Sequence, residues 1–274
     1  MKILLAAMFL VSAPLNAQWL NYPTAGVPRG ADGSPDLNAP MPRTADGKPD
    51  FSGTWDIEHN RPCPPGGCLD MQVPEEFVNI GWGIKRGLPY QPWAAEAVKN
   101  RMIENGKDDP MSKCLPAVIV HAHTTPLLKK YMQVPGLLSI LTEQSAMYRQ
   151  IFTDGRPMPD VDMPSFNGFS VGKWEGDTLV VDSIGFKDST WLDARGLPHT
   201  QDLHLTERIH RMGENLAFDI TFEDPGAFTK PWTAHLIYKP SPDGSMSENI
   251  YTISDELRFR ERFLNQKVNI PIRR

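Results

Sequence analysis

The feature of this sequence that most constrains its fold is a series of segments after residue 128 in which apolar and polar side chains alternate with a period of two. Such alternation is typical of half-buried β-strands, whose successive side chains point to opposite faces of a sheet. Turn sequences such as Pro135-Gly136, Asp154-Gly155 and Gly213-Glu214 separate the segments and favour hairpins. The predicted strands are 51–57, 129–134, 137–143, 147–153, 168–174, 178–186, 203–212, 216–223, 233–239 and 247–253. Consecutive antiparallel strands of this kind predict a mainly β fold in which a meander closes into a barrel.

The strand predicted at 203–212 has no purely apolar face. Leu205, Glu207 and Ile209 share one face, and the opposite face carries His204 and Arg208. Charged groups inside a barrel must be paired or solvated, because burying a lone charge is costly. This strand therefore predicts one of two arrangements: a partly polar lumen that encloses a polar ligand or water, or ion pairs between strands on the outer surface.

Four side chains are candidates for binding a ligand in such a lumen. Arg149 and Arg156 could each point either into the lumen or toward the outer surface. Arg208 could hold a carboxylate in a bidentate pair. Trp191 belongs to a set of tryptophans that could form the wall of an apolar pocket, although aromatic residues in a barrel more often fill its core.

The first 17 residues have the three-part build of a secretory signal peptide. A positive start at Met1-Lys2 is followed by an apolar run at 3–11 and by small residues up to Ala17, after which we expect cleavage. The alternative is an uncleaved membrane anchor. The apolar run argues against it, because it is shorter than the roughly 20 residues that a membrane-spanning helix needs. Export predicts a periplasmic or secreted protein, and the rest of the chain predicts a soluble one without stable membrane insertion.

Composition limits the partners and the domain organisation. The formal net charge of −5 argues against nucleic acid, which requires a basic face. The 26 prolines and 21 glycines predict many turns and long loops. We expect an extended Pro/Gly-rich arm at 18–50, in which the pattern of residues 28–36 returns at 42–50. One barrel domain should follow at 51–274, with a helical or irregular insertion at about 60–125. Within that domain, helices are predicted at 92–105 and at 255–266. The sequence does not indicate the oligomeric state.

The three cysteines predict one local disulfide. Cys63 and Cys68 flank a Pro-Pro-Gly-Gly turn, and in an oxidising compartment such a pair is expected to be bridged. A metal site is the alternative. Cys114 is then either buried or a partner of one of the other two.

Several longer motifs carry a family resemblance. They are residues 46–55 (DGKPDFSGTW), 154–156 (DGR), 172–182 (GKWEGDTLVVD) with Gly185-Phe186, and 190–193 (TWLD) followed by Gly196, Pro198-His199, Leu203-His204 and Glu207-Arg208. With these motifs the mature chain resembles a large, mostly uncharacterised family of secreted bacterial proteins. The resemblance implies export and a lipocalin-like barrel. Together with the residue patterns above, the expected fold is an antiparallel lipocalin-like β-barrel with an extended N-terminal arm and one or two short helices. It implies no catalytic residues.

The candidate catalytic residues are Asp193, His199, His204 and Glu207. A carboxylate beside two imidazoles supplies a general base and the group that orients it, and Gly196 precedes His199 on a predicted loop at the rim of the barrel. The alternative is that Asp193 and His199 cap the turn. The sequence contains no Gly-x-Ser-x-Gly nucleophile turn, no phosphate loop and no dinucleotide motif, so no cofactor is predicted.

A second candidate is the pair His121 and His123. On a strand, both imidazoles would point to one side and could chelate zinc or copper. The alternative is two surface histidines on a loop, because no third ligand is evident.

Three functional hypotheses remain from the sequence. The first is an exported enzyme that carries out cofactor-free acid/base chemistry of the lyase, isomerase or hydrolase type on a small organic molecule. The second is a periplasmic binder or carrier with the same cavity and no catalysis. The third is an envelope-associated structural protein, for which no sizeable polar-lined cavity is expected.

Overall fold

The structure is a computed structural model, and it describes residues 27–36, 39–40, 42–59, 78, 80–84, 86–104 and 106–250. The predicted signal peptide at 1–17, the Cys63–Cys68 pair and the predicted helix at 255–266 lie outside the described residues.

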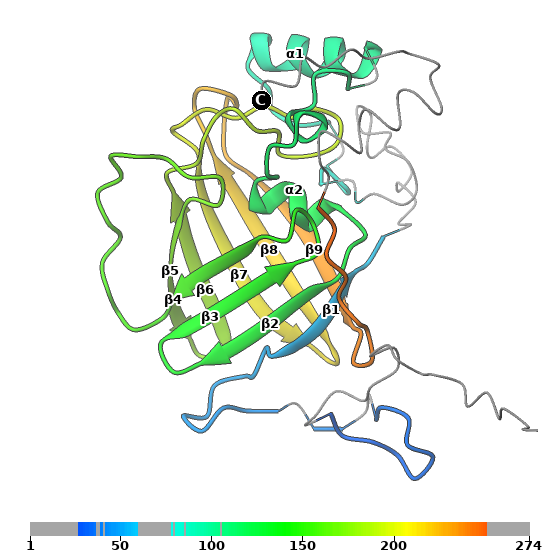
Figure 1. Cartoon of the computed structure of the whole chain (residues 1–274). Helices are drawn as coiled ribbons and strands as arrows, with labels where there is room; N and C mark the ends of the chain where they lie inside the picture. The colour runs from blue at the N-terminus through cyan, green and yellow to red at the C-terminus, as the bar shows by residue number, and fades with distance from the viewer. Residues whose placement is uncertain are drawn as a thin grey trace, which may run out of the picture.

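A closed barrel of nine strands dominates the fold (Figure 1). Antiparallel pairing between β1 and β9 closes the barrel, so the sheet has no free edge there. The strands are β1 Gly53–Ile57, β2 Lys129–Val134, β3 Leu137–Thr142, β4 Tyr148–Phe152, β5 Phe169–Glu175, β6 Thr178–Ile184, β7 His204–Met212, β8 Asn215–Glu223 and β9 Trp232–Pro240. The predicted lipocalin-like β-barrel is therefore confirmed.

The period-two pattern places the core inside the barrel. In β7, Leu205, Glu207 and Ile209 are buried, while Arg208 between them is exposed. The sequence predicts a tenth strand at 247–253. The described residues of this segment, 247–250, form no strand, and Asn249 makes only an isolated bridge to Gln144.

One pair of neighbouring strands departs from the predicted antiparallel meander. β4 and β5 are parallel, and their ladder holds only two residue pairs, Ile151 with Ser170 and Phe152 with Val171. Asp154-Gly155 does not make a hairpin. Instead, residues 153–168 form the long loop at the side of the barrel in Figure 1 and return the chain to the starting end of β4. Parallel neighbours need such a crossover connection.

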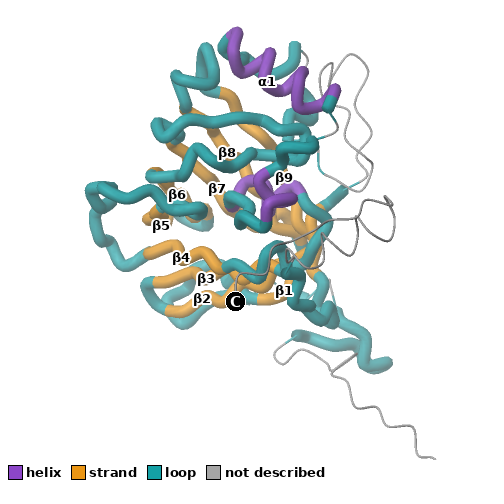
Figure 2. Tube along the Cα trace, turned by 45° about the horizontal axis from the view of Figure 1, so that its top comes forward, coloured by secondary structure: helices purple, strands orange, loops and turns teal. Residues whose placement is uncertain are grey.

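Two helices and one short 3₁₀ turn complete the described secondary structure. The predicted helix at 92–105 is observed as α1 Pro92–Ile103, and the 3₁₀ turn is η1 Pro110–Lys113. The second helix, α2 Ile119–Thr124, is buried along its whole length. Figure 2 shows this short helix within the ring of strands, so α2 closes one end of the barrel from the inside. None of the helices that the structure describes combines the length and the apolar composition that crossing a bilayer requires.

The repeat in the N-terminal arm has a structural purpose. Arg29 and Arg43 occupy the same position in the two copies, and each donates to the carbonyl of the glycine four residues later, at 2.9 and 2.8 Å. Each arginine also pairs with an aspartate outside the arm: Arg29 with Asp243 at 2.6 Å and Arg43 with Asp177 at 2.7 Å. The two turns thus attach the arm to the end of the barrel opposite α1 (Figure 1).

Candidate functional site

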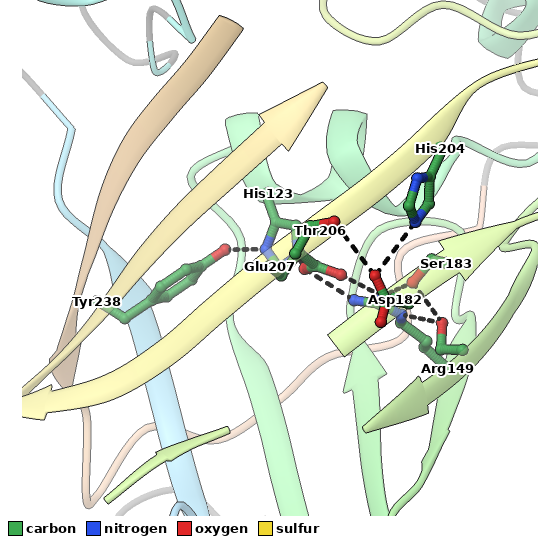
Figure 3. Close-up of polar contacts among 9 residues, drawn as sticks. His123, Arg149, Asp182, Ser183, His204, Thr206, Glu207 and Tyr238 are labelled. Atoms are coloured by element: carbon green, nitrogen blue, oxygen red, sulfur yellow. Dashed lines mark hydrogen bonds and ion pairs between the residues drawn. The ribbon is translucent and has the colours of Figure 1, made fainter. Parts of the chain in front are cut away.

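A buried ion pair crosses the lumen between β4 and β7. Arg149 Nη1 donates to Glu207 Oε1 at 3.0 Å, and Nη2 bonds the second carboxylate oxygen (Figure 3). The same guanidinium donates from Nε to Ser170 Oγ at 3.1 Å and from Nη2 to Ser183 Oγ at 2.8 Å. Both charged side chains are about 1% exposed. The network is built from β4, β5, β6 and β7, and its hydrogen bonds offset the cost of burying the two charges.

His123 brings α2 into contact with the barrel wall. Its Nδ1 bonds the hydroxyl of Tyr238 on β9 (Figure 3), and its Nε2 lies 3.8 Å from Glu207 Oε1. Burial, reinforced by the charges of Lys129 and Arg149, lowers the pKa of His123 well below its ordinary value, so the imidazole is neutral. Because burial raises the pKa of Tyr238, its hydroxyl keeps a proton that it can donate to Nδ1. With Tyr238 as the donor to Nδ1, the neutral imidazole carries its proton on Nε2, which faces Glu207.

Lys129 is a second cation inside the barrel. Its side chain is buried on β2, and Nζ donates to the carbonyl oxygens of Thr125 at 3.0 Å and Leu127 at 2.8 Å. Desolvation lowers the pKa of this ammonium to about 7, opposed by the negative charges of Asp56 and Glu143.

A cavity of about 720 Å³ opens where β4 and β5 diverge, beneath the 153–168 loop. We call it the seam cavity. Aromatic side chains and arginines stand out in its lining, and the inner wall includes Arg149 and Ser170 from the ion-pair network. The aromatic residues are Tyr148, Phe152, Phe166 and Phe169. The pattern of apolar walls with a few polar groups is that of small-molecule sites, which typically occupy about 300–1,000 Å³.

Asn167 lines this cavity and carries a hydrogen-bond acceptor without a partner among the described residues. Its Nδ2 donates to the backbone oxygen of Tyr148 at 2.9 Å, which fixes the orientation of the amide, since a carbonyl can only accept. Its Oδ1 is shielded from solvent and has no hydrogen-bond partner among the described residues. A ligand in the cavity would reach this oxygen after a small movement of the amide, and it would then need an N–H or O–H group to bond it.

The structure places Asp193 in a loop rather than in the lumen. Its carboxylate pairs with Arg195 and accepts hydrogen bonds from the backbone N–H groups of Arg195 and Leu197, both at 3.1 Å. It is 1% exposed. This arrangement is a turn cap of the kind named above as the alternative to a catalytic role.

His199 has a similar position in the same loop. Its Nδ1 donates to the backbone oxygen of Thr200 at 3.0 Å, and Nε2 lies 2.9 Å from the hydroxyl of Thr190. Burial lowers the pKa of His199, so both ring nitrogens of a neutral imidazole are engaged in holding the loop.

His204 and Glu207 lie on opposite faces of β7. His204 points outward and contacts Asp182 at 3.1 Å and Glu223 at 3.3 Å, whereas Glu207 points inward (Figure 3). Arg208 is also outside, where it pairs with Glu175 at 3.0 Å. The alternation of the strand thus separates Glu207 from His204 and Arg208, as the period-two pattern indicated.

The remaining two predicted ligand residues are also separated from each other. Arg156 lines the seam cavity, with its guanidinium 3.7 Å above the ring of Phe152 and paired with Asp154 at 2.6 Å. Trp191 is buried elsewhere, and the guanidinium of Arg101 lies 4.7 Å from the centre of its ring. Only Arg149 and Arg156 of the predicted residues line the seam cavity.

His121 and His123 lie neither on a strand, as the chelating arrangement required, nor on a surface loop, because both are buried in the helix α2. Residues two apart on a helix point to different sides: His123 faces Tyr238, and His121 bonds the backbone of Trp191. Within the part of the chain that the structure describes, no three histidine, cysteine, aspartate or glutamate side chains are placed to share a metal ion.

Sequence reasoning missed Asn167, Ser170 and Ser183 as site residues. Ser170 and Ser183 occupy inward positions of their strands, where a small hydroxyl beside apolar neighbours was the available signal. No signal existed for Asn167, because its role depends on the crossover between β4 and β5.

Comparison of the chain with models of known protein families finds no match, and comparison with curated proteins likewise finds none.

Proposed function

We propose that this chain is an exported binding protein that holds a small amphipathic organic molecule in the seam cavity. The observation that carries the proposal is the cavity itself, which joins aromatic walls to the buried Arg149 network beside the shortest ladder of the barrel.

The lining favours binding over catalysis. Among the described residues, the cavity is lined by no histidine, aspartate, glutamate, lysine or cysteine. The hydroxyls of Tyr148, Ser165 and Ser170, which do line it, therefore have no general base among the other lining residues to activate them. The acid/base alternative has less support, since Asp193 and His199 are fully engaged in one loop and His204 lies on the outer face.

The polar groups of the cavity define the ligand class. Arg156 can take an anionic group, because its present partner Asp154 is solvent-exposed and exposed pairs of this kind are weak. The unused Oδ1 of Asn167 calls for a hydroxyl or amide donor. The aromatic side chains suit a ring, so we infer that the ligand is an aromatic carboxylate with a hydrogen-bond donor.

The test compares two fluorescent probes, 6-hydroxy-2-naphthoate and 2-naphthoate, which differ only in the hydroxyl donor. Wild-type protein should bind the hydroxylated probe about tenfold more tightly, as expected for a bond to an otherwise unpaired buried acceptor. The variant Asn167→Ala should lose this preference while still binding 2-naphthoate.

The matched control is Asn100→Ala on the exposed face of α1, which should keep the preference of the wild type. Failure of the wild type to bind either probe, or an unchanged preference in Asn167→Ala, would refute the proposal.

A further inference from the structure

A second cavity lies at the opposite end of the barrel from α1, between the N-terminal arm and the ends of β1, β7 and β9. It measures about 480 Å³, and we call it the floor cavity. Five prolines line it: Pro28, Pro40, Pro42, Pro240 and Pro242. The pairs Arg29–Asp243 and Arg43–Asp177 hold the arm that forms one side.

Arg211, near the end of β7, is the cation of this cavity. Its guanidinium lies 4.9 Å from the ring centre of Trp55, which also lines the cavity. Its Nε is shielded from solvent without a hydrogen-bond partner among the described residues. Desolvation lowers its pKa, against the opposing charges of Asp50 and Glu214.

The contrast with the arm arginines shows why this side chain is unusual. Arg29 and Arg43 each form a bidentate pair with an aspartate. Within the described part of the chain, Arg211 has no ion pair within 4 Å, since Asp50 and Glu214 act on it from a greater distance. A half-buried guanidinium without a partner is an available site for a planar, two-oxygen anion.

We propose that the floor cavity is a second ligand site, which binds a small monocarboxylate with an apolar ring. The carboxylate pairs with the guanidinium of Arg211, which itself lies over the buried indole of Trp55, and the ring packs against the proline walls. Asp36 and Glu214 also line the cavity, and Asp50 acts on Arg211 from outside the lining. These carboxylates oppose a second negative charge, so the site selects monocarboxylates over dicarboxylates. This site is independent of the seam cavity, because the two share no lining residue.

The experiment titrates phenylacetate into the full-length protein and follows the indole N–H signals by ¹H–¹⁵N NMR. The signal of Trp55 should move with phenylacetate concentration, while that of Trp191, at the other end of the barrel, should stay in place. The neutral isostere phenylacetamide should bind at least tenfold more weakly to the same wild-type protein, so this comparison does not depend on how a variant folds.

The variant Arg211→Gln should weaken phenylacetate binding at least tenfold. Lys130→Gln removes an equal charge from an exposed position on β2 and should leave the affinity within twofold of the wild type. An unmoved Trp55 signal, equal binding of acid and amide, or unchanged affinity in Arg211→Gln would each overturn the proposal. The naphthoate test uses the variant at Asn167 to detect binding in the seam cavity, and the phenylacetate test uses Trp55 and the variant at Arg211 to detect binding in the floor cavity. A negative result at one site is therefore distinguishable from a negative result at the other.

Discussion

Replacing Glu207 by leucine should destabilise the barrel strongly, because it leaves the buried positive charge of Arg149 without a compensating negative charge. The guanidinium loses both carboxylate bonds and keeps only the hydroxyls of Ser170 and Ser183. Removing one member of a buried ion pair typically costs about 3–5 kcal/mol. For a domain of this size, that corresponds to a fall in melting temperature of roughly 6–20 °C.

The double variant Arg149→Met/Glu207→Leu provides the decisive comparison. With both charges replaced by apolar side chains of similar length, no group is left uncompensated, and the free energy of unfolding should return to within about 1 kcal/mol of the wild type. The favourable coupling between the two changes should then be about 2–3 kcal/mol or more.

The assay is equilibrium unfolding in urea, followed by tryptophan fluorescence and by circular dichroism, with coincident transitions as the test of two-state behaviour. A loss below 1 kcal/mol in Glu207→Leu would show that Arg149 has access to solvent. A double variant as unstable as the sum of the single variants would refute the reasoning about the pair.

The remaining predictions concern stability. Lys129 has a folded pKa of about 7 against an ordinary value of 10.5, so between these values only the unfolded chain holds the proton. The stability that the neutral, buried Lys129 contributes to the folded state is therefore fully present above about pH 10.5 and is lost as the pH falls toward 7. From pH 7.5 to 9, the free energy of unfolding of the wild type should therefore rise relative to Lys129→Met by roughly 1–2 kcal/mol; a pH-independent difference in urea unfolding would contradict this. Gly168 has φ of 62°, and an added Cβ would lie 2.5 Å from the backbone oxygen of Ile184, whereas Gly176 has φ of 60° and open space. Gly168→Ala should thus lower the melting temperature more than Gly176→Ala, which bears only the cost of about 1 kcal/mol for the left-handed backbone, and equal losses would refute the steric argument. Asp193→Asn should destabilise by about 3 kcal/mol, since it breaks a buried pair with Arg195, while His204→Gln on the outer face should unfold close to the wild type; the reverse order in urea would argue against the assignment of these residues.

The period-two pattern predicted which side chains of a strand share a face, but it left open whether the charged residues enter the barrel. Glu207 stands between Leu205 and Ile209, and this local alternation alone predicts that it shares their face. The sequence also left open whether Arg149 lies inside, and only the tertiary structure shows that these two charges meet.

The parts of the site that depend on long-range packing could not be predicted. Asp154-Gly155 has the composition of a hairpin turn, yet β5 pairs in parallel because the chain crosses back along the barrel. Residues 119–124 combine β-branched and apolar side chains, which favour a strand by propensity, but burial in the mouth of the barrel selects a helix. The seam cavity arises from the first of these departures, and the position of His123 arises from the second.

The central claim is that a ligand lies between the 153–168 loop and the β4–β5 seam. A crystal structure of the wild-type protein with 6-hydroxy-2-naphthoate tests it most directly. We predict a probe among the aromatic side chains of the seam cavity, with its hydroxyl about 2.7–3.0 Å from Asn167 Oδ1 and its carboxylate toward Arg156. A probe bound elsewhere on the barrel, with the seam cavity unaltered, would contradict the account.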